Sequence, residues 1–311
     1  MKVYCYGSIN IDHVYQVPHW MQPGETLAST HYQRVLGGKG ANQSIALARA
    51  GACVSHIGRL GAGDEWAKVE IAASGVDCQL VDVTDQPSGH AIIQVDAAGE
   101  NSILLYGGAN QSFTQADLDE LFRGLVAGDW LLLQNECSLT GYAMEAAIKR
   151  KVRIAFNPSP LSKDITLLPL EQLALLVLNQ VEMVQLFPES EGLMSSPEML
   201  MTFIEKQLPD TEVVVTMGSS GALWCGPAGR FFVNAFDVEV VDTTAAGDTF
   251  LGYLLASIVS GLAPQACLHQ ASAAAALAVQ TSGASTSIPL KSRVEDFLSQ
   301  SGECRLIEIA Q

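Results

Sequence analysis

Two glycine-rich segments of the sequence carry residue types that can bind an anion or a polyol. The first is Gly37-Gly-Lys-Gly-Ala-Asn42, which precedes a run of small residues typical of a helix. Glycines permit close backbone approach to a ligand, and a helix N-terminus adds free N–H groups and a positive dipole end. Lys39 contributes a full charge, and Asn42 can hydrogen-bond a hydroxyl group. The segment therefore suits a polyol or phosphate ligand, although a tight strand-to-helix turn with a solvated lysine fits the same residues.

The second segment, Asp242-Thr-Thr-Ala-Ala-Gly-Asp-Thr-Phe250, follows an apolar run at Val238–Val241 and begins a helix predicted to end near Ser260. From Ala245 to Asp248, consecutive backbone N–H groups could point at one anion, such as a phosphoryl group in transfer. Asp248 would lie beside that anion and accept the proton of an attacking hydroxyl group. The positive helix end is expected to keep this carboxylate ionised. The alternative is an aspartate that only caps the helix of an ordinary α/β unit.

These segments need a scaffold that brings helix N-termini together, and the rest of the sequence predicts one. Apolar runs typical of parallel strands buried on both faces alternate with helical patterns. The alternation predicts an α/β fold class with a doubly wound, mainly parallel sheet and helices on both faces. The strand-like runs are Lys2–Ile9, Val54–Arg59, Trp130–Gln134, Arg153–Asn157, Leu175–Asn179, Val213–Met217 and Val238–Val241. The helical segments are Ala41–Ala50, Asp64–Ala73, Gln115–Leu125, Tyr142–Lys151, Pro197–Gln207, Thr249–Ser260 and Gln265–Val279.

Two stretches, at about 11–36 and 88–107, interrupt this alternation. In the second, Gly89–Val95 and Asn101–Tyr106 read as two strands of a hairpin. Strands without covering helices predict a small β-sheet apart from the main one, which would act as a lid or a dimer surface. An antiparallel extension of the main sheet is the alternative. Because no linker or internal repeat is visible, we expect one domain over residues 1–311.

Composition excludes several classes of function. The 311 residues include 17 Lys and Arg against 33 Asp and Glu, a formal net charge of −16, which argues against nucleic-acid binding. No apolar run approaches the length of a membrane span, and the first residues do not resemble a signal peptide. The seven cysteines are far apart and show no metal or redox spacing. We therefore expect a cytoplasmic protein with free thiols.

The two segments lie about 200 residues apart, and this combination resembles the ribokinase-like (PfkB-type) carbohydrate kinases. The resemblance extends from Gly7-Ser-Ile-Asn-Ile-Asp-His13 to Gly283–Pro289. It implies a single α/β domain whose lid often pairs two subunits, hence a homodimer. It also implies an ATP-dependent sugar kinase that phosphorylates D-ribose at its 5-hydroxyl group.

The resemblance assigns residues to the sugar and to the chemistry. Asp248 matches the catalytic base, and the backbone amides of Ala245, Ala246 and Gly247 match an anion hole. The residues that match sugar contacts are Asn10, Asp12, Gly38, Lys39, Asn42 and Glu136.

The resemblance also implies ATP, Mg²⁺ and a monovalent cation, K⁺. Asn179 and Glu182 match an element that organises Mg²⁺ and phosphates. Ser272 matches a position beside the adenine, and the run from Thr216 through Gly218 and Ser219 to Gly221 matches the ATP-binding turn. The residues that match the K⁺ ligands are Asp242, Thr244, Ala278, Thr281, Gly283 and Ser287.

Other functions remain open at this point. A kinase of the same fold could act on deoxyribose, a ketohexose or a nucleoside, because the motifs alone separate these substrates poorly. A non-catalytic sugar-binding relative is disfavoured by the presence of Asp248 and the intact Ala-Ala-Gly-Asp248 segment. A dinucleotide-dependent oxidoreductase is disfavoured because no Gly-x-Gly-x-x-Gly follows a strand.

Overall fold

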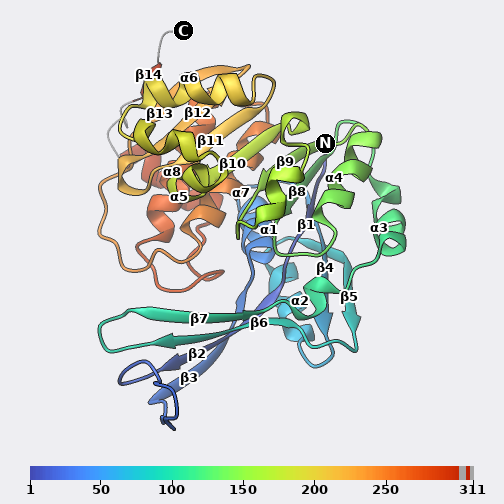
Figure 1. Cartoon of the computed structure of the whole chain (residues 1–311), viewed down its shortest axis with the longest axis vertical. Helices are drawn as coiled ribbons and strands as arrows, with labels where there is room; N and C mark the ends of the chain where they lie inside the picture. The colour runs from blue at the N-terminus through green and yellow to red at the C-terminus, as the bar shows by residue number, and fades with distance from the viewer. Residues whose placement is uncertain (301–305, 309–311) are drawn as a thin grey trace.

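The computed structural model describes residues 1–300 and 306–308, which form one large and one small β-sheet (Figure 1). The large sheet has ten strands. These strands are β1 (Val3–Tyr6), β4 (Val54–Gly61), β5 (Asp77–Thr84), β8 (Trp130–Gln134), β9 (Arg153–Asn157), β10 (Leu175–Asn179), β11 (Glu212–Thr216), β12 (Ala222–Gly226), β13 (Gly229–Val233) and β14 (Leu306–Glu308).

The large sheet is parallel from one edge to beyond its middle. Its strand order is β14-β13-β12-β11-β10-β9-β8-β1-β4-β5. Every pairing from β11 to β5 is parallel, whereas β12, β13 and β14 are added antiparallel. β1 lies between β4 and β8. The chain first adds β4 and β5 on one side of β1, and later adds β8 and the strands after it on the other side. This is the strand reversal beside which open α/β sheets bind ligands.

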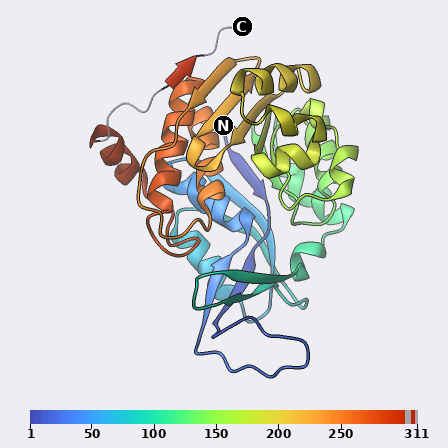
Figure 2. The same cartoon turned by 60° about the vertical axis from the view of Figure 1, so that its left-hand side comes forward.

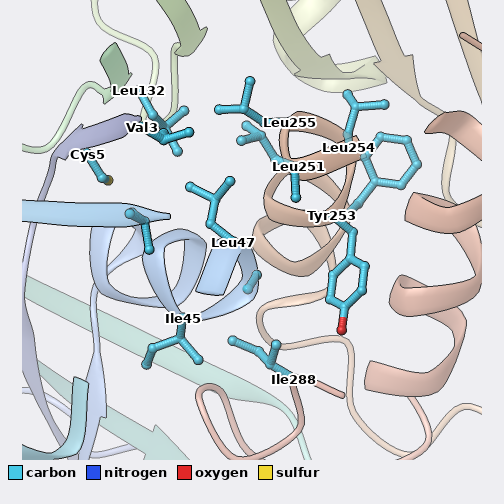
Figure 3. Close-up of a cluster of buried hydrophobic side chains, with 14 of the residues drawn as sticks. Val3, Cys5, Ile45, Leu47, Leu132, Leu251, Tyr253, Leu254, Leu255 and Ile288 are labelled. Carbon is cyan, nitrogen blue, oxygen red and sulfur yellow. The ribbon is translucent and has the colours of Figure 1, made fainter. Parts of the chain in front are cut away.

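Alternate residues of the central strands enter two different cores. In β1, Val3 and Cys5 belong to one buried cluster, whereas Tyr4 and Tyr6 belong to the other. A strand covered on both faces needs apolar side chains at every position, which explains the continuous apolar runs. Figure 3 shows Val3 and Cys5 facing Leu47 and Leu251, which come from helices.

Helices cover both faces of the sheet (Figure 2), as the sequence predicts. Across the described ranges, none of them combines the length and apolar character that crossing a membrane requires. The first face carries α1 (Lys39–Arg49), α2 (Glu65–Ala73), α7 (Ala246–Val259), α8 (Pro264–Ala278) and α9 (Lys291–Gln300). The second face carries α3 (Gln115–Leu121), α4 (Thr140–Lys149), α5 (Gln180–Leu186) and α6 (Pro197–Gln207).

The small sheet projects from one end of the large sheet (Figure 1). Its strands are β2 (Asn10–Gln16), β3 (His31–Gly37), β6 (Gly89–Val95) and β7 (Asn101–Tyr106), in the order β3-β2-β6-β7. The predicted hairpin of β6 and β7 is confirmed, with the residue bounds expected from the sequence. The prediction of a separate sheet is also confirmed, and the alternative of an extension to the main sheet is wrong.

One predicted strand is wrong. Val238–Val241 does not pair with any described strand and forms a loop in which Val240 and Val241 are exposed. The N–H groups of Val241 and Asp242 both donate to the Val279 carbonyl at the end of α8. An apolar run predicts a buried strand. This segment is instead a loop that hydrogen bonds hold to the end of α8. α7 also begins at Ala246, earlier than the expected Thr249.

Candidate active site

The polar residues of the candidate site gather where the central strands end. Ser8 follows β1, Glu136 follows β8, and Asn179 is the last residue of β10. Parallel strands place their carboxyl ends at one edge of the sheet. The N-termini of α1 and α7 face this edge, because each helix returns along one face of the sheet. Helix dipoles and side chains therefore converge on one place.

Asp248 lies in the first turn of α7 and is 9% exposed. Both of its carboxylate oxygens are held by α1. Gln43 Nε2 donates to Oδ1 over 2.8 Å, and Asn42 Nδ2 donates to Oδ2 over 3.1 Å. Asn42 Oδ1 is buried and has no hydrogen-bond partner among the described residues.

The start of α7 has a backbone suited to an anion. Ala245 has a positive φ of 59°, which is strained for a residue with a side chain. The N–H of Ala246 donates to the Thr243 carbonyl over 3.2 Å, so this amide is already used within the loop. Within residues 1–300 and 306–308, the N–H groups of Ala245, Gly247 and Asp248 have no backbone acceptor. These amides are free donors at the N-terminus of the helix.

Burial moves the pKa of Asp248 above its ordinary value. The positive charge of Lys39 and the amides of Gln43 and Asn42 act in the opposite direction and lower it. The positive helix end, on which the expectation from the sequence rests, favours the ionised form. The structure adds desolvation, which favours the neutral form and is the larger effect.

Lys39 is the positive centre of the site. Burial lowers the pKa of its ammonium group, but the nearby carboxylates of Asp248 and Glu136 raise it, and Glu182 adds to this effect. The net pKa of Lys39 lies above its ordinary value, so the group is cationic. Glu136 accepts a hydrogen bond from Ser8 Oγ and another, of 3.1 Å, from the Lys39 backbone N–H. Burial nevertheless raises the pKa of Glu136.

Asn10 and Asp12 lie at the base of the small sheet, on the same face of β2. Asp12 lies over Gly37 of β3, where a Cβ would overlap the Asp12 carboxylate, so only glycine fits there. Burial, reinforced by the charge of Glu136, raises the pKa of Asp12 to about 6. Asn10 Oδ1 accepts a 2.8 Å hydrogen bond from Asn110 Nδ2.

The residues expected to bind nucleotide follow β10 and β11. Asn179 and Glu182 form a reciprocal capping box that starts α5, with bonds of 2.8 and 2.9 Å between side chain and backbone. Thr216 is the last residue of β11, and Gly218–Ser220 form one turn of 3₁₀-helix before Gly221. Ser272 is buried within α8. The first two elements therefore lie at the carboxyl ends of the parallel strands.

The two segments expected to hold K⁺ meet at Asp242. Its Oδ1 accepts from the Thr244 N–H over 2.9 Å, and its Oδ2 accepts from the Gly283 N–H over 2.9 Å. Burial would raise the pKa of Asp242, but these hydrogen bonds lower it below its ordinary value. Ser287 is buried, and its hydroxyl donates to the Ala284 carbonyl. An ionised carboxylate thus joins two loops rich in backbone carbonyls.

Four amide residues of the site were missed from the sequence, namely Gln43, Asn110, Gln134 and Asn157. Asn157 is half-buried, and the other three are buried. They hold other site residues rather than facing a ligand, so the motif pattern gives no role for them. A signal was present for Gln134 and Asn157, because an amide at the end of an apolar strand must find a hydrogen-bond partner.

Comparison with known proteins gives a consistent result. Residues 1–291 match the model of the pfkB family carbohydrate kinases. A ribokinase of Haemophilus influenzae is 34% identical over 301 residues, covering 94% of this chain and 96% of the relative. Two solved structures share the fold over nearly their full length. The ribokinase of Cryptococcus neoformans in complex with ADP has a TM-score of 0.82 and 32% identity, covering 95% of this chain and 99% of that one. The ribokinase of Arabidopsis thaliana complexed with ribose and ATP has a TM-score of 0.77 and 28% identity, covering 96% and 99%.

Proposed function

The chain belongs to the pfkB family of carbohydrate kinases, and we propose that it transfers the γ-phosphoryl group of ATP to the 5-hydroxyl group of D-ribose. Relatives named ribokinase, at up to 34% identity over nearly the whole chain, support ribose as the sugar. The observation that carries the reaction is Asp248, a buried carboxylate at a helix N-terminus beside the cationic Lys39.

In the proposed reaction, Asp248 accepts the proton of the sugar hydroxyl group as its oxygen attacks the γ-phosphorus. A new O–P bond forms, the bond to the β-phosphate oxygen breaks, and ADP leaves. The anion hole proposed from Ala245 to Gly247 uses the N–H groups of Ala245 and Gly247, because Ala246 already donates to Thr243. Each such donor contributes about 2.7–4 kcal/mol at a developing charge.

The proposed sugar pocket has two walls. Asn10 and Asp12 come from the small sheet, whereas Gly38, Lys39 and Asn42 come from the turn into α1. The unpartnered Asn42 Oδ1 supports a contact to a sugar hydroxyl group, since a buried polar atom without a partner is costly. Glu136 would complete the pocket from the large sheet.

We assign the nucleotide to Asn179, Glu182, Ser272 and the turn at 216–221. Among the described residues, no three His, Cys, Asp or Glu side chains cluster as a metal site. Mg²⁺ fits this arrangement as a companion of the nucleotide, because it prefers phosphate and water oxygens to a protein cage. Glu182 engages only Oε2 in its capping box, so Oε1 remains for such a contact. When bound, Mg²⁺ would neutralise charge on the phosphates.

A monovalent cation fits the loops at Asp242. The donor set that we propose consists of hard oxygen atoms, which suit K⁺. It comprises the Asp242 carboxylate, the Ser287 hydroxyl and the carbonyls of Thr244, Ala278, Thr281 and Gly283. When bound, K⁺ would add positive field next to the anion hole.

We further propose that both sheets belong to one domain and that the small sheet is a lid that pairs two subunits. Every residue of β7 is exposed, including Ile103, Leu104, Leu105 and Tyr106. Apolar side chains exposed on both faces of an edge strand are typical of an interaction site. Lid closure over the sugar would exclude water and prevent hydrolysis of ATP. Sedimentation equilibrium checks the homodimer, and a monomer at all concentrations would refute it.

The test of the function is ADP release from ATP and Mg²⁺ with D-ribose, 2-deoxyribose, fructose or adenosine, each with and without K⁺. We expect turnover selective for D-ribose and stimulated by K⁺. Faster turnover on another acceptor would keep the kinase reaction and refute the sugar assignment.

The matched variant is Asp248→Ala, measured with the preferred sugar. Loss of the proton acceptor should lower kcat by about 10²–10⁴-fold, while D-ribose still binds in calorimetry. Near-normal turnover would remove Asp248 from the reaction. Turnover by neither protein, with D-ribose still bound, would instead indicate a sugar-binding relative without activity.

A further inference from the structure

The side chain of Gln43 contacts the proposed reaction only through Asp248. Its Nε2 donates to Asp248 Oδ1 over 2.8 Å, while Asn42 Nδ2 holds Oδ2. Gln43 is only 1% exposed, so it does not face a bound sugar. A buried amide that contacts the proton acceptor but not the sugar can affect only the charge and the orientation of Asp248.

The hydrogen bonds of Gln43 match an ionised Asp248. Gln43 presents its NH₂ group to Asp248 and its side-chain carbonyl to the opposite side, and an ionised carboxylate only accepts hydrogen bonds. On that side, Gln134 Nε2 donates to Gln43 Oε1 over 2.7 Å. A protonated Asp248 would need an acceptor for its own hydrogen, and an amide NH₂ group cannot act as one. This arrangement therefore favours the ionised carboxylate.

Two strand ends of the large sheet anchor the Gln43 amide. Gln134 is the last residue of β8, and Asn157 is the last residue of β9. Gln43 Nε2 also donates to Asn157 Oδ1 over 3.4 Å, and Asn157 Nδ2 donates to the Val177 carbonyl over 3.0 Å. The amide of Gln43 thus has a partner for its carbonyl and for both hydrogens, so its orientation is fixed by the sheet.

Close packing of α1 and α7 brings Gln43 within reach of Asp248. Gly252 lies one turn after Asp248. A Cβ at this position would overlap Ala46 of α1 and lie 3.0 Å from the backbone carbonyl oxygen of Gln43. A glycine at this contact lets the two helix backbones approach each other. The short distance between Gln43 and Asp248 is therefore built into the helix interface.

We propose that Gln43, anchored by Gln134, is a positioning residue that holds the Asp248 carboxylate ionised and directed toward the attacking hydroxyl group. This role rests on the proposed function, because it requires Asp248 to take the proton.

Several other groups act on the charge of Asp248. Lys39 of α1 favours the ionised form, whereas Glu136 after β8 opposes it and the Cys5 thiol of β1 lies nearby. Burial raises the pKa of Asp248, and Gln43 is the larger of the two amide contributions that lower it. Removing this amide should therefore make the carboxylate easier to protonate.

The experiment is the pH dependence of kcat for the wild type and Gln43→Leu, at saturating D-ribose and ATP. Saturating sugar is needed because protonation of Asp12 would act on sugar binding. We expect the acidic limb of the Gln43→Leu profile to move up by about one pH unit, since a charged acceptor loses one of its two amide donors. The KM for D-ribose should change by less than about twofold, since Gln43 does not touch the sugar.

Gln134→Leu and Ser44→Ala complete the test. Gln134 does not touch Asp248, but its loss frees the Gln43 amide, so the limb should move in the same direction by a smaller amount. Ser44 lies next to Gln43 on α1 and bonds His56 instead of Asp248. If the shift came only from a general disturbance of α1, the acidic limb of Ser44→Ala would move as well. We expect that limb to stay at the wild-type pH.

An acidic limb of Gln43→Leu at the wild-type position would overturn the positioning role, whatever the change in kcat. If Gln43→Leu does not fold, an unmoved limb in Gln134→Leu overturns it equally. Failure of the proposed function looks different, since Asp248→Ala would then keep its turnover. An inactive Asp248→Ala together with an unshifted Gln43→Leu would refute only the role of Gln43.

Discussion

The buried histidine of β4 should make the protein lose stability in mild acid. His56 is fully buried, its Nε2 lies 3.1 Å from the Gly7 carbonyl, and its Nδ1 lies 2.8 Å from Ser44 Oγ. A carbonyl only accepts, so Nε2 carries a hydrogen. Because burial disfavours the charged form, the ring is neutral at pH 7, and its Nδ1 then accepts from the serine. Burial lowers its pKa from 6.5 to about 4, although the bond to Gly7 acts in the opposite direction.

The sign and size of the effect follow from this shift. Between pH 6.5 and about 4, the unfolded chain binds a proton at His56 that the folded chain does not bind. Stability is thus complete above pH 6.5 and falls as the pH decreases toward 4. The shift corresponds to about 3 kcal/mol in total, of which about 2 kcal/mol is lost by about pH 5.

The measurement compares the wild type with His56→Gln, which keeps an amide donor but does not titrate. Urea unfolding at about pH 7.5, 6 and 5 gives the free energy of unfolding of each protein. Other titrating groups, including Asp12 and Asp248, contribute to both curves and cancel in the difference. The wild type should lose about 2 kcal/mol more than the variant over this range. Parallel curves would refute the conclusion that the buried ring must stay neutral.

Three further changes test other parts of the structure. Because the pKa of Asp12 is about 6, the KM for D-ribose should rise about tenfold from pH 7 to pH 5 as the carboxylate is protonated, and the KM of Asp12→Asn should lack this dependence. Gly221→Ala would force a Cβ into the Val233 carbonyl at a φ of 117°, and thermal unfolding should show a loss of at least about 2 kcal/mol. Arg49 donates to the carbonyls of Ser285 and Ile288 over 2.8 and 2.6 Å. Arg49→Met should raise the K⁺ concentration that gives half-maximal activity by about threefold or more. An unchanged concentration would show that the loop at 285–288 does not affect cation binding.

Local signals in the sequence predicted much of the fold. Thr114 and Asp117 form a capping box at α3, a pattern that is visible in the sequence, and Gly51 and Gly261 adopt a positive φ just after α1 and α7. These features depend on residues only a few positions apart. The loop at Val238–Val241 was predicted wrongly because its partner, the end of α8, lies about 40 positions away in the sequence. The antiparallel strands β12 and β13 were also missed, although at five residues each they are as long as β8 to β11, which were predicted.

For the candidate site, the sequence supplied the residues to which we assign the chemistry, because glycine, lysine and aspartate at these spacings can bind a polyol and a phosphoryl group. The tertiary structure decided how those residues are tuned. Desolvation of Asp248 and Asp12 depends on helices and strands that pack around them from distant parts of the chain. The support of Asp248 by Gln43 and Gln134 likewise exists only once α1, α7 and β8 are assembled. Burial and hydrogen-bond partners are properties of three-dimensional neighbours, and a linear pattern contains the residues but not these distances.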